Sequence, residues 1–184
     1  MKKTTYLLLF LTSITLISSC GIYKFNGGST GDAKTIQVDF FPNQAALIEP
    51  QLSQRFTQDM QDLFLRQTNL DLAATGGDLR FEGEITGYRV NPMSATSQQT
   101  AAQNRLTITV NVRFYNRLKE EDDFEKQFSF YSDFDANAQL TGGVLDAALE
   151  EILERIIQDI FNASLGNWNE HRSFHKYHLT SRNF

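Results

Sequence analysis

The chain has 184 residues and a formal net charge of −5, with 41% hydrophobic and 21% charged residues. This length suits a single domain, and the composition is too apolar for a disordered chain. The negative charge argues against a nucleic-acid binder, and the single cysteine excludes an intramolecular disulfide framework and a multi-thiolate metal site.

The first twenty residues have the pattern of a secretory signal peptide. Lys2 and Lys3 precede an apolar stretch from Tyr6 to Ile17, which is too short to span a bilayer. The stretch ends in Ile17-Ser18-Ser19-Cys20, which resembles a bacterial lipobox. In lipoproteins with that motif the chain is cut before the cysteine, and the cysteine is acylated. We therefore expect residues 1–19 to be a lipoprotein signal peptide and Cys20 to carry the anchor; the alternative is a signal peptide with an incidental cysteine.

Acyl chains on Cys20 would hold the mature protein stably on a membrane. Gly21 stands where an aspartate would signal retention in the inner membrane, so the expected location is the outer membrane. Residues 20–34 are rich in glycine and predict a lipidated tether. We expect a single folded domain over residues 35–168 and a polar tail over residues 169–184.

The folded part begins with a predicted strand, Thr35 to Phe41, whose alternation places Ile36, Val38 and Phe40 on one side. An amphipathic helix should follow Pro50, because apolar residues recur at spacings of three and four from Leu52. A second strand is predicted from Leu79 to about Pro92. Its Gly83 and Gly87 indicate a bulge or a close backbone approach.

The second half of the chain predicts a hairpin and a second helix. A polar loop is expected from Asn91 to Asn104, followed by the most regular alternation in the chain, from Leu106 to Tyr115. A charged tip precedes a further strand from Phe124 to Phe134. The helix should begin after Gly143, with Gly166 suited to its C-terminal cap.

This order of strand, helix, three strands and helix predicts an α+β fold. Four strands and two amphipathic helices on one face of the sheet form a two-layer sandwich. The expected core is rich in phenylalanine: Phe56, Phe64, Phe81, Phe114, Phe128 and Phe130. The other face has no predicted cover and should be polar, with Thr107, Thr109, Arg113, Tyr115, Gln127 and Tyr131.

The lipobox followed by Gly21-Ile22-Tyr23, the glycine-rich tether and this element order resemble the lipopolysaccharide-assembly lipoprotein (LptE-like) family. The resemblance covers about Cys20 to Asn167. It implies a non-catalytic lipoprotein at the inner leaflet of the outer membrane, which plugs a β-barrel translocon, helps it to assemble and delivers lipopolysaccharide to the cell surface. An uncovered polar sheet face suits the polar lumen of such a barrel.

Contact with lipopolysaccharide phosphates is implied by the same resemblance. The Asn91 to Asn104 loop has no Lys or Arg, so the nearest cationic candidates are Arg89, Arg105, Arg113 and Arg117. Arg113, Tyr115 and Tyr131 are the candidates for contact with the barrel, since their residue types are enriched at protein interfaces. No cofactor is expected.

Other chemistries find less support. His171, His175 and His178 could hold a metal only if the tail were helical, and scattered histidines of a polar tail are the alternative. No catalytic triad, phosphate loop or dinucleotide fingerprint is present, so no enzyme is expected. The alternative function is a freestanding periplasmic lipoprotein that binds a small ligand or peptide on its open sheet face.

Overall fold

We describe the protein from a computed structural model, which describes residues 30–93 and 102–166. The elements are β1 (Thr35–Val38), α2 (Leu52–Gln67), β2 (Asp71–Leu72), β3 (Leu79–Met93), β4 (Gln103–Asn116), the short 3-10 helix η2 (Glu120–Asp122), β5 (Phe124–Asp135) and α3 (Gly142–Leu165). Within these ranges, neither helix has the length and apolarity needed to cross a membrane.

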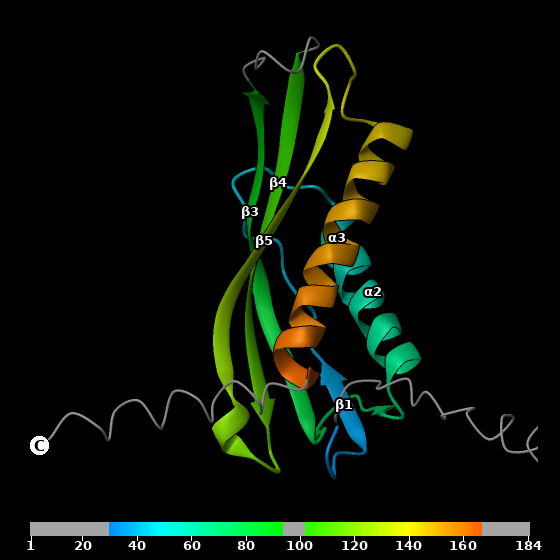
Figure 1. Ribbon diagram of the computed structural model, residues 1–184, viewed down its shortest axis with the longest axis vertical. Coiled ribbons are helices and arrows are strands. Elements are labelled where there is room, and N and C mark those ends of the chain that lie inside the picture. Colours follow the sequence, from blue (N-terminus) through cyan, green and yellow to red (C-terminus); the bar gives the residue numbers. More distant parts are fainter. Residues whose placement is uncertain (1–29, 94–101, 167–184) are drawn as a thin grey trace, which may run out of the picture.

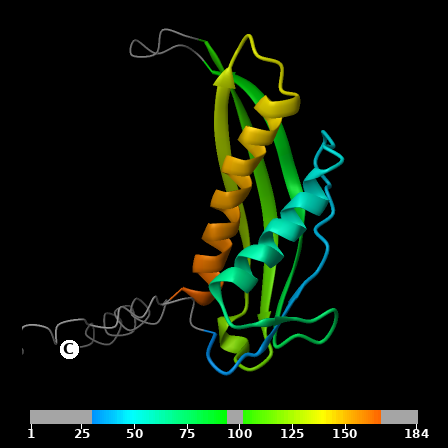
Figure 2. The same cartoon turned by 90° about the vertical axis from the view of Figure 1, so that its right-hand side faces the viewer.

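The strands form one mixed sheet in the order β2-β1-β3-β4-β5. β1 is parallel to β2 and β3, whereas β3, β4 and β5 form an antiparallel meander. Both helices pack on one face of this sheet, so the molecule has two layers (Figures 1 and 2). The predicted α+β class is confirmed. The sheet has five strands where four were predicted. The additional strand, β2, has only two residues, too few to show the alternation by which a strand is predicted.

Aromatic side chains fill the space between the helices and the sheet. Phe64 of α2 packs against Phe81 of β3 and Phe161 of α3, with ring centroids 4.8 and 5.2 Å apart. Phe81 in turn contacts Phe114 of β4 at 4.7 Å. The predicted core residues Phe56, Phe64, Phe81, Phe114 and Phe128 are buried. Phe130 is only partly buried, because β5 is an edge strand and its far side has no neighbour.

The prediction that Phe40 faces the core is wrong. β1 ends at Val38, and the chain then leaves the regular alternation, so Phe40 is 61% exposed and Phe41 is fully buried. The Phe41 N–H donates to Thr57 Oγ1 of α2 at 3.2 Å, and its ring packs against Phe56 at 5.0 Å. Tertiary contacts with α2, which no local pattern displays, therefore decide which phenylalanine is inside.

Gly83 lies at a close backbone approach and Gly87 at a bulge, the two features that the sequence predicted for these glycines. A Cβ atom at Gly83 would overlap the backbone carbonyl of Asn111 and lie 2.7 Å from Phe41 Cε1, so β4 and the 39–45 segment approach the backbone closely there. A bulge shifts the register between Ile85 and Gly87.

The expected loop from Asn91 to Asn104 is shorter than predicted at both ends, because β3 continues to Met93 and β4 begins at Gln103.

Candidate interaction face

The face of the sheet opposite the helices presents polar side chains in cross-strand rows. β4 contributes alternate residues, and its neighbours β3 and β5 place polar partners beside most of them. We call this surface the outer face. Its residues are Arg80, Glu82, Glu84, Arg89, Arg105, Thr107, Thr109, Asn111, Arg113, Tyr115, Glu125, Gln127, Ser129, Tyr131 and Asp133. Among the described elements, none covers it: both helices lie on the other side of the sheet (Figure 1).

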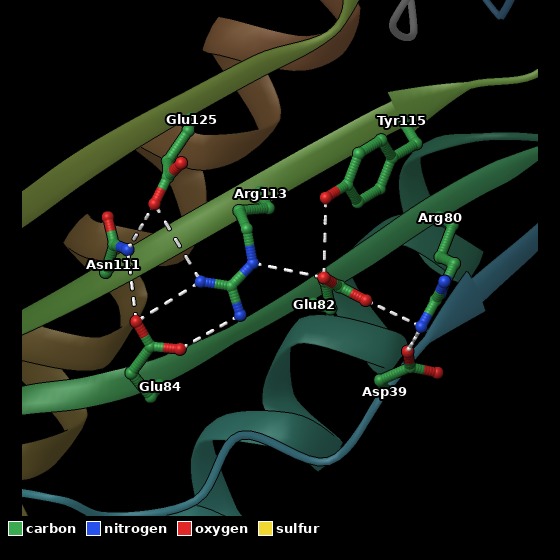
Figure 3. Close-up of polar contacts among 8 residues, drawn as sticks. All are labelled: Asp39, Arg80, Glu82, Glu84, Asn111, Arg113, Tyr115 and Glu125. Atoms are coloured by element: carbon green, nitrogen blue, oxygen red, sulfur yellow. Dashed lines mark hydrogen bonds and ion pairs between the residues drawn. The ribbon is translucent and has the colours of Figure 1, made fainter.

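Arg113 is the centre of an ion network on this face (Figure 3). Its Nε donates to Glu82 Oε1 at 3.1 Å, and its Nη2 donates to Glu84 Oε2 at 3.0 Å. Asn111 Nδ2 donates to both Glu84 and Glu125, at 3.1 and 2.9 Å. The pKa of Glu84 is lowered by the hydrogen bonds that it accepts, chiefly from Arg113 and secondly from Asn111. The pKa of Arg113 is raised by the hydrogen bonds that it donates to Glu84 and Glu82.

A second arginine extends the network toward β1. Arg80 Nε and Nη2 donate to Asp39 Oδ2 at 2.9 and 2.6 Å, and Nη2 also lies 2.6 Å from Glu82 Oε2. The hydrogen bond to Asp39 is the main cause of the raised pKa of Arg80. The whole network joins two arginines to four carboxylates, those of Asp39, Glu82, Glu84 and Glu125, so this end of the outer face is acidic.

The other end of the outer face is basic and aromatic. Arg105 binds Asp133 through two hydrogen bonds of 2.7 and 2.8 Å, which lower the pKa of Asp133. The Arg105 guanidinium also lies 3.5 Å from the ring centroid of Tyr131, a cation–π contact. The side chain of Arg89 is exposed and makes no hydrogen bond or ion pair with another described residue.

The structure separates the four arginines proposed from sequence. Arg105 and Arg113 are eight residues apart on β4, a distance of about 27 Å along a strand. Arg117 lies beyond the end of β4, where its Nη1 donates to Gly76 O at 2.8 Å and so ties two turns together. Arg89 and Arg105 remain as neighbours on the outer face, since Arg89 is paired in register with Thr107.

Tyr115 and Tyr131, the proposed partner contacts, both lie on the outer face, at opposite ends of it. Tyr115 donates its hydroxyl to Glu82 at 3.4 Å, whereas Tyr131 is 43% exposed. The sequence reasoning missed Glu82, Glu84 and Asn111 as members of a network. Alternation alone places them on the polar side of their strands, but only the register of β3 against β4 brings them to Arg113.

Several sequence predictions concern residues outside the described ranges. Cys20 and most of the tether precede Thr30, and His171, His175 and His178 follow Gly166. Within residues 30–93 and 102–166, no group of three or more metal-ligating side chains is arranged to hold a metal ion. On the helix side, a charged groove lies between α2 and α3 and is lined among others by Arg55, Asp59 and Glu150.

Comparison with known proteins identifies a family. The sequence model of the family described as "LptE: Lipopolysaccharide-assembly" matches residues 33–164, which include both helices except the last residue of α3, and all five strands. No curated protein matches the chain.

Three solved structures with a similar arrangement are distant in sequence. A minor lipoprotein from Acinetobacter baumannii is 10% identical, with a TM-score of 0.46 over 73% of this chain and 92% of the other. Lipoprotein B from Nitrosomonas europaea is 15% identical, with a TM-score of 0.38 over 77% and 85%. A lipoprotein from Neisseria meningitidis is 11% identical, with a TM-score of 0.39 over 70% and 99%. These similarities are too low to assign a function.

Proposed function

Because the chain belongs to the lipopolysaccharide-assembly (LptE) family, we propose that it is a non-catalytic outer-membrane lipoprotein that plugs and supports a β-barrel translocon for lipopolysaccharide. Cys20 would carry the acyl anchor, and the glycine-rich residues 20–34 would tether the domain of residues 35–168 to the membrane.

The observation that supports the proposal best is the uncovered outer face. It spans three long strands, its side chains are polar, and most of them are linked to one another by hydrogen bonds. The lumen of an outer-membrane barrel is likewise polar. A face of this kind can lie against the barrel wall without exposing apolar surface on either side.

The two ends of the outer face suit different contacts. The acidic end, around Glu82, Glu84 and Glu125, fits basic side chains of a barrel wall, and Tyr115 lies beside it. The basic end offers Arg89 and Arg105 to an anionic group such as a lipid phosphate. Arg89 is the better phosphate ligand, because Arg105 would have to give up its two hydrogen bonds to Asp133.

Copurification tests the barrel partnership. The acylated full-length chain, extracted in mild detergent, should copurify in roughly equal amounts with an outer-membrane β-barrel protein. If the fully acylated chain is extracted alone, the result would contradict the proposal and favour a freestanding lipoprotein that binds a ligand on the same face.

Lipid binding by the basic end is tested separately. Arg89→Ser should weaken retention of purified lipopolysaccharide on the immobilised chain, while Arg117→Ser should not, since Arg117 is occupied by the Gly76 carbonyl. Equal retention by both variants and the parent would exclude Arg89 as a lipid-phosphate contact.

A further inference from the structure

The two edges of the sheet differ in length. β2 forms one edge with two residues, whereas β5 forms the other with twelve. A long edge strand presents unpaired backbone N–H and C=O groups, which a second chain can use to extend the sheet. In Figure 2, β5 (yellow-green) is the leftmost strand of the sheet, with no other strand beyond it. The structure must therefore protect β5 if the chain is to remain unpaired.

Four side chains form a continuous stack around the middle of β5. The rings of Phe130 and Tyr131 are parallel within 17°, and their centroids are 5.6 Å apart. The Arg105 guanidinium lies 3.5 Å from the Tyr131 centroid, and the Arg155 guanidinium of α3 lies 5.7 Å from the Phe130 centroid. The stack thus runs from the outer face, past the strand, to the helix layer.

This arrangement requires both rings to lean over the free edge. Successive side chains of a strand point to opposite faces of the sheet, so neighbouring rings in their usual directions are much farther apart than 5.6 Å. β4 occupies the other side of β5, which leaves only the open edge for Phe130 and Tyr131 to meet. An incoming strand would have to displace both rings before it reached the backbone of residues 130–131.

Other edge positions carry recognised devices against strand addition. Lys126 lies on the helix side of β5, in register with Val112, and its exposed ammonium group lies 5.1 Å from the Phe128 ring centroid. An inward-pointing lysine on an edge strand disfavours pairing with another sheet. On β3, hydrogen bonds between Ile85 and the 42–44 segment cover the lower part of the edge. Above them, a bulge and Pro92 interrupt it.

We propose that the stack of Arg105, Tyr131, Phe130 and Arg155 closes the edge of β5 and prevents a second copy of this chain from extending the sheet. The occupant that it excludes is the β5 strand of another copy, because β5 has the longest edge of the described sheet without a neighbouring strand. The inference does not depend on the barrel partnership, since it concerns the chain alone.

A double variant tests the proposal without touching the core. Tyr131→Thr with Arg155→Thr removes the outer-face ring and the guanidinium on α3; both side chains are exposed, and threonine favours strand structure at position 131. The matched control is Tyr115→Thr with Arg66→Thr, which removes the same residue types from an interior strand and from α2. Full-length acylated chains are compared by native mass spectrometry, with circular dichroism to verify folding.

The edge variant should show a dimer fraction about tenfold above that of the parent at equal concentration, because one stacking contact and two cation–π contacts no longer oppose association. Hydrogen exchange should then slow at the amides of residues 128–132. A dimer fraction equal to that of the control, or slowed exchange confined to other segments, would overturn the proposal. If the double variant loses its fold, the single variant Arg155→Thr gives the same comparison, and its failure to dimerise more than Arg66→Thr would also overturn it.

Discussion

Val110→Asp is the substitution that most sharply tests which side of β4 faces the core. Val110 is fully buried between its cross-strand neighbours Ile85 and Phe128. The variant loses about 1.5 to 3 kcal/mol of apolar burial and places a carboxyl group where no polar partner is available, which costs roughly 1 to 3 kcal/mol more. The sum is a large part of a total stability of about 5 to 15 kcal/mol.

The matched control for this variant is Thr109→Asp on the opposite side of the same strand. Thr109 is partly exposed, and its hydroxyl exchanges a hydrogen bond of 3.0 Å with Ser129, which an aspartate can accept in its place. Asn111 is a poorer control, because an aspartate there would face the carboxylates of Glu84 and Glu125.

Thermal unfolding followed by circular dichroism measures both variants. Val110→Asp should lower Tm by about 10 °C or leave no cooperative transition, whereas Thr109→Asp should lower it by about 3 °C or less. Equal losses in the two variants would refute the assignment of the two sides of β4, and with it the identity of the outer face.

Three further predictions test the outer network, the close approach at β3 and the anchor. Arg113→Met should cost about 1 kcal/mol at neutral pH, and the cost should disappear on acidification. The lowered pKa of Glu84 contributes stability above pH 4.5, the ordinary pKa of the group, and this stability is lost as the pH falls through the folded-state pKa. A cost in urea unfolding that does not depend on pH would contradict this. Gly83→Ala should destabilise by about 1 to 3 kcal/mol through overlap with the Asn111 carbonyl, while Gly143→Ala, with open space around it, should not destabilise in the same assay. Cys20→Ala should leave the protein unprocessed or released from the membrane fraction on a blot, and a cleaved variant that stays in the outer membrane of cells without the barrel would argue against the anchor.

Most of the fold was predictable because its long elements repeat a clear period. The alternation from Leu106 to Tyr115 and the helical spacing from Leu52 both reflect burial on one side, and the structure places their apolar residues in the core. β2 was not predictable, since two residues carry no period. Phe40 was misplaced because the direction of the chain after Val38 is set by contacts with α2 rather than by local sequence.

The composition of the outer face was predictable, but its organisation was not. The sequence indicates that Arg113, Tyr115 and Tyr131 share a polar side of the sheet. It does not indicate that Arg113 is held by Glu82 and Glu84, since that depends on the register of two strands about thirty residues apart in the chain. The pairing changes the interpretation of Arg113, from a cation open to ligands to the centre of an ion network.

Site-specific photocrosslinking tests most directly whether the outer face contacts the barrel. A photoreactive amino acid at Gln127, an exposed outer-face position on β5, is compared with the same residue at Gln58, an exposed position on α2 in the opposite layer. In intact cells the Gln127 probe should form a crosslinked product with an outer-membrane β-barrel protein, and the Gln58 probe should form much less. A barrel product from Gln58 with none from Gln127 would contradict contact through the outer face, and the absence of a barrel product from both would contradict the barrel partnership at these two faces.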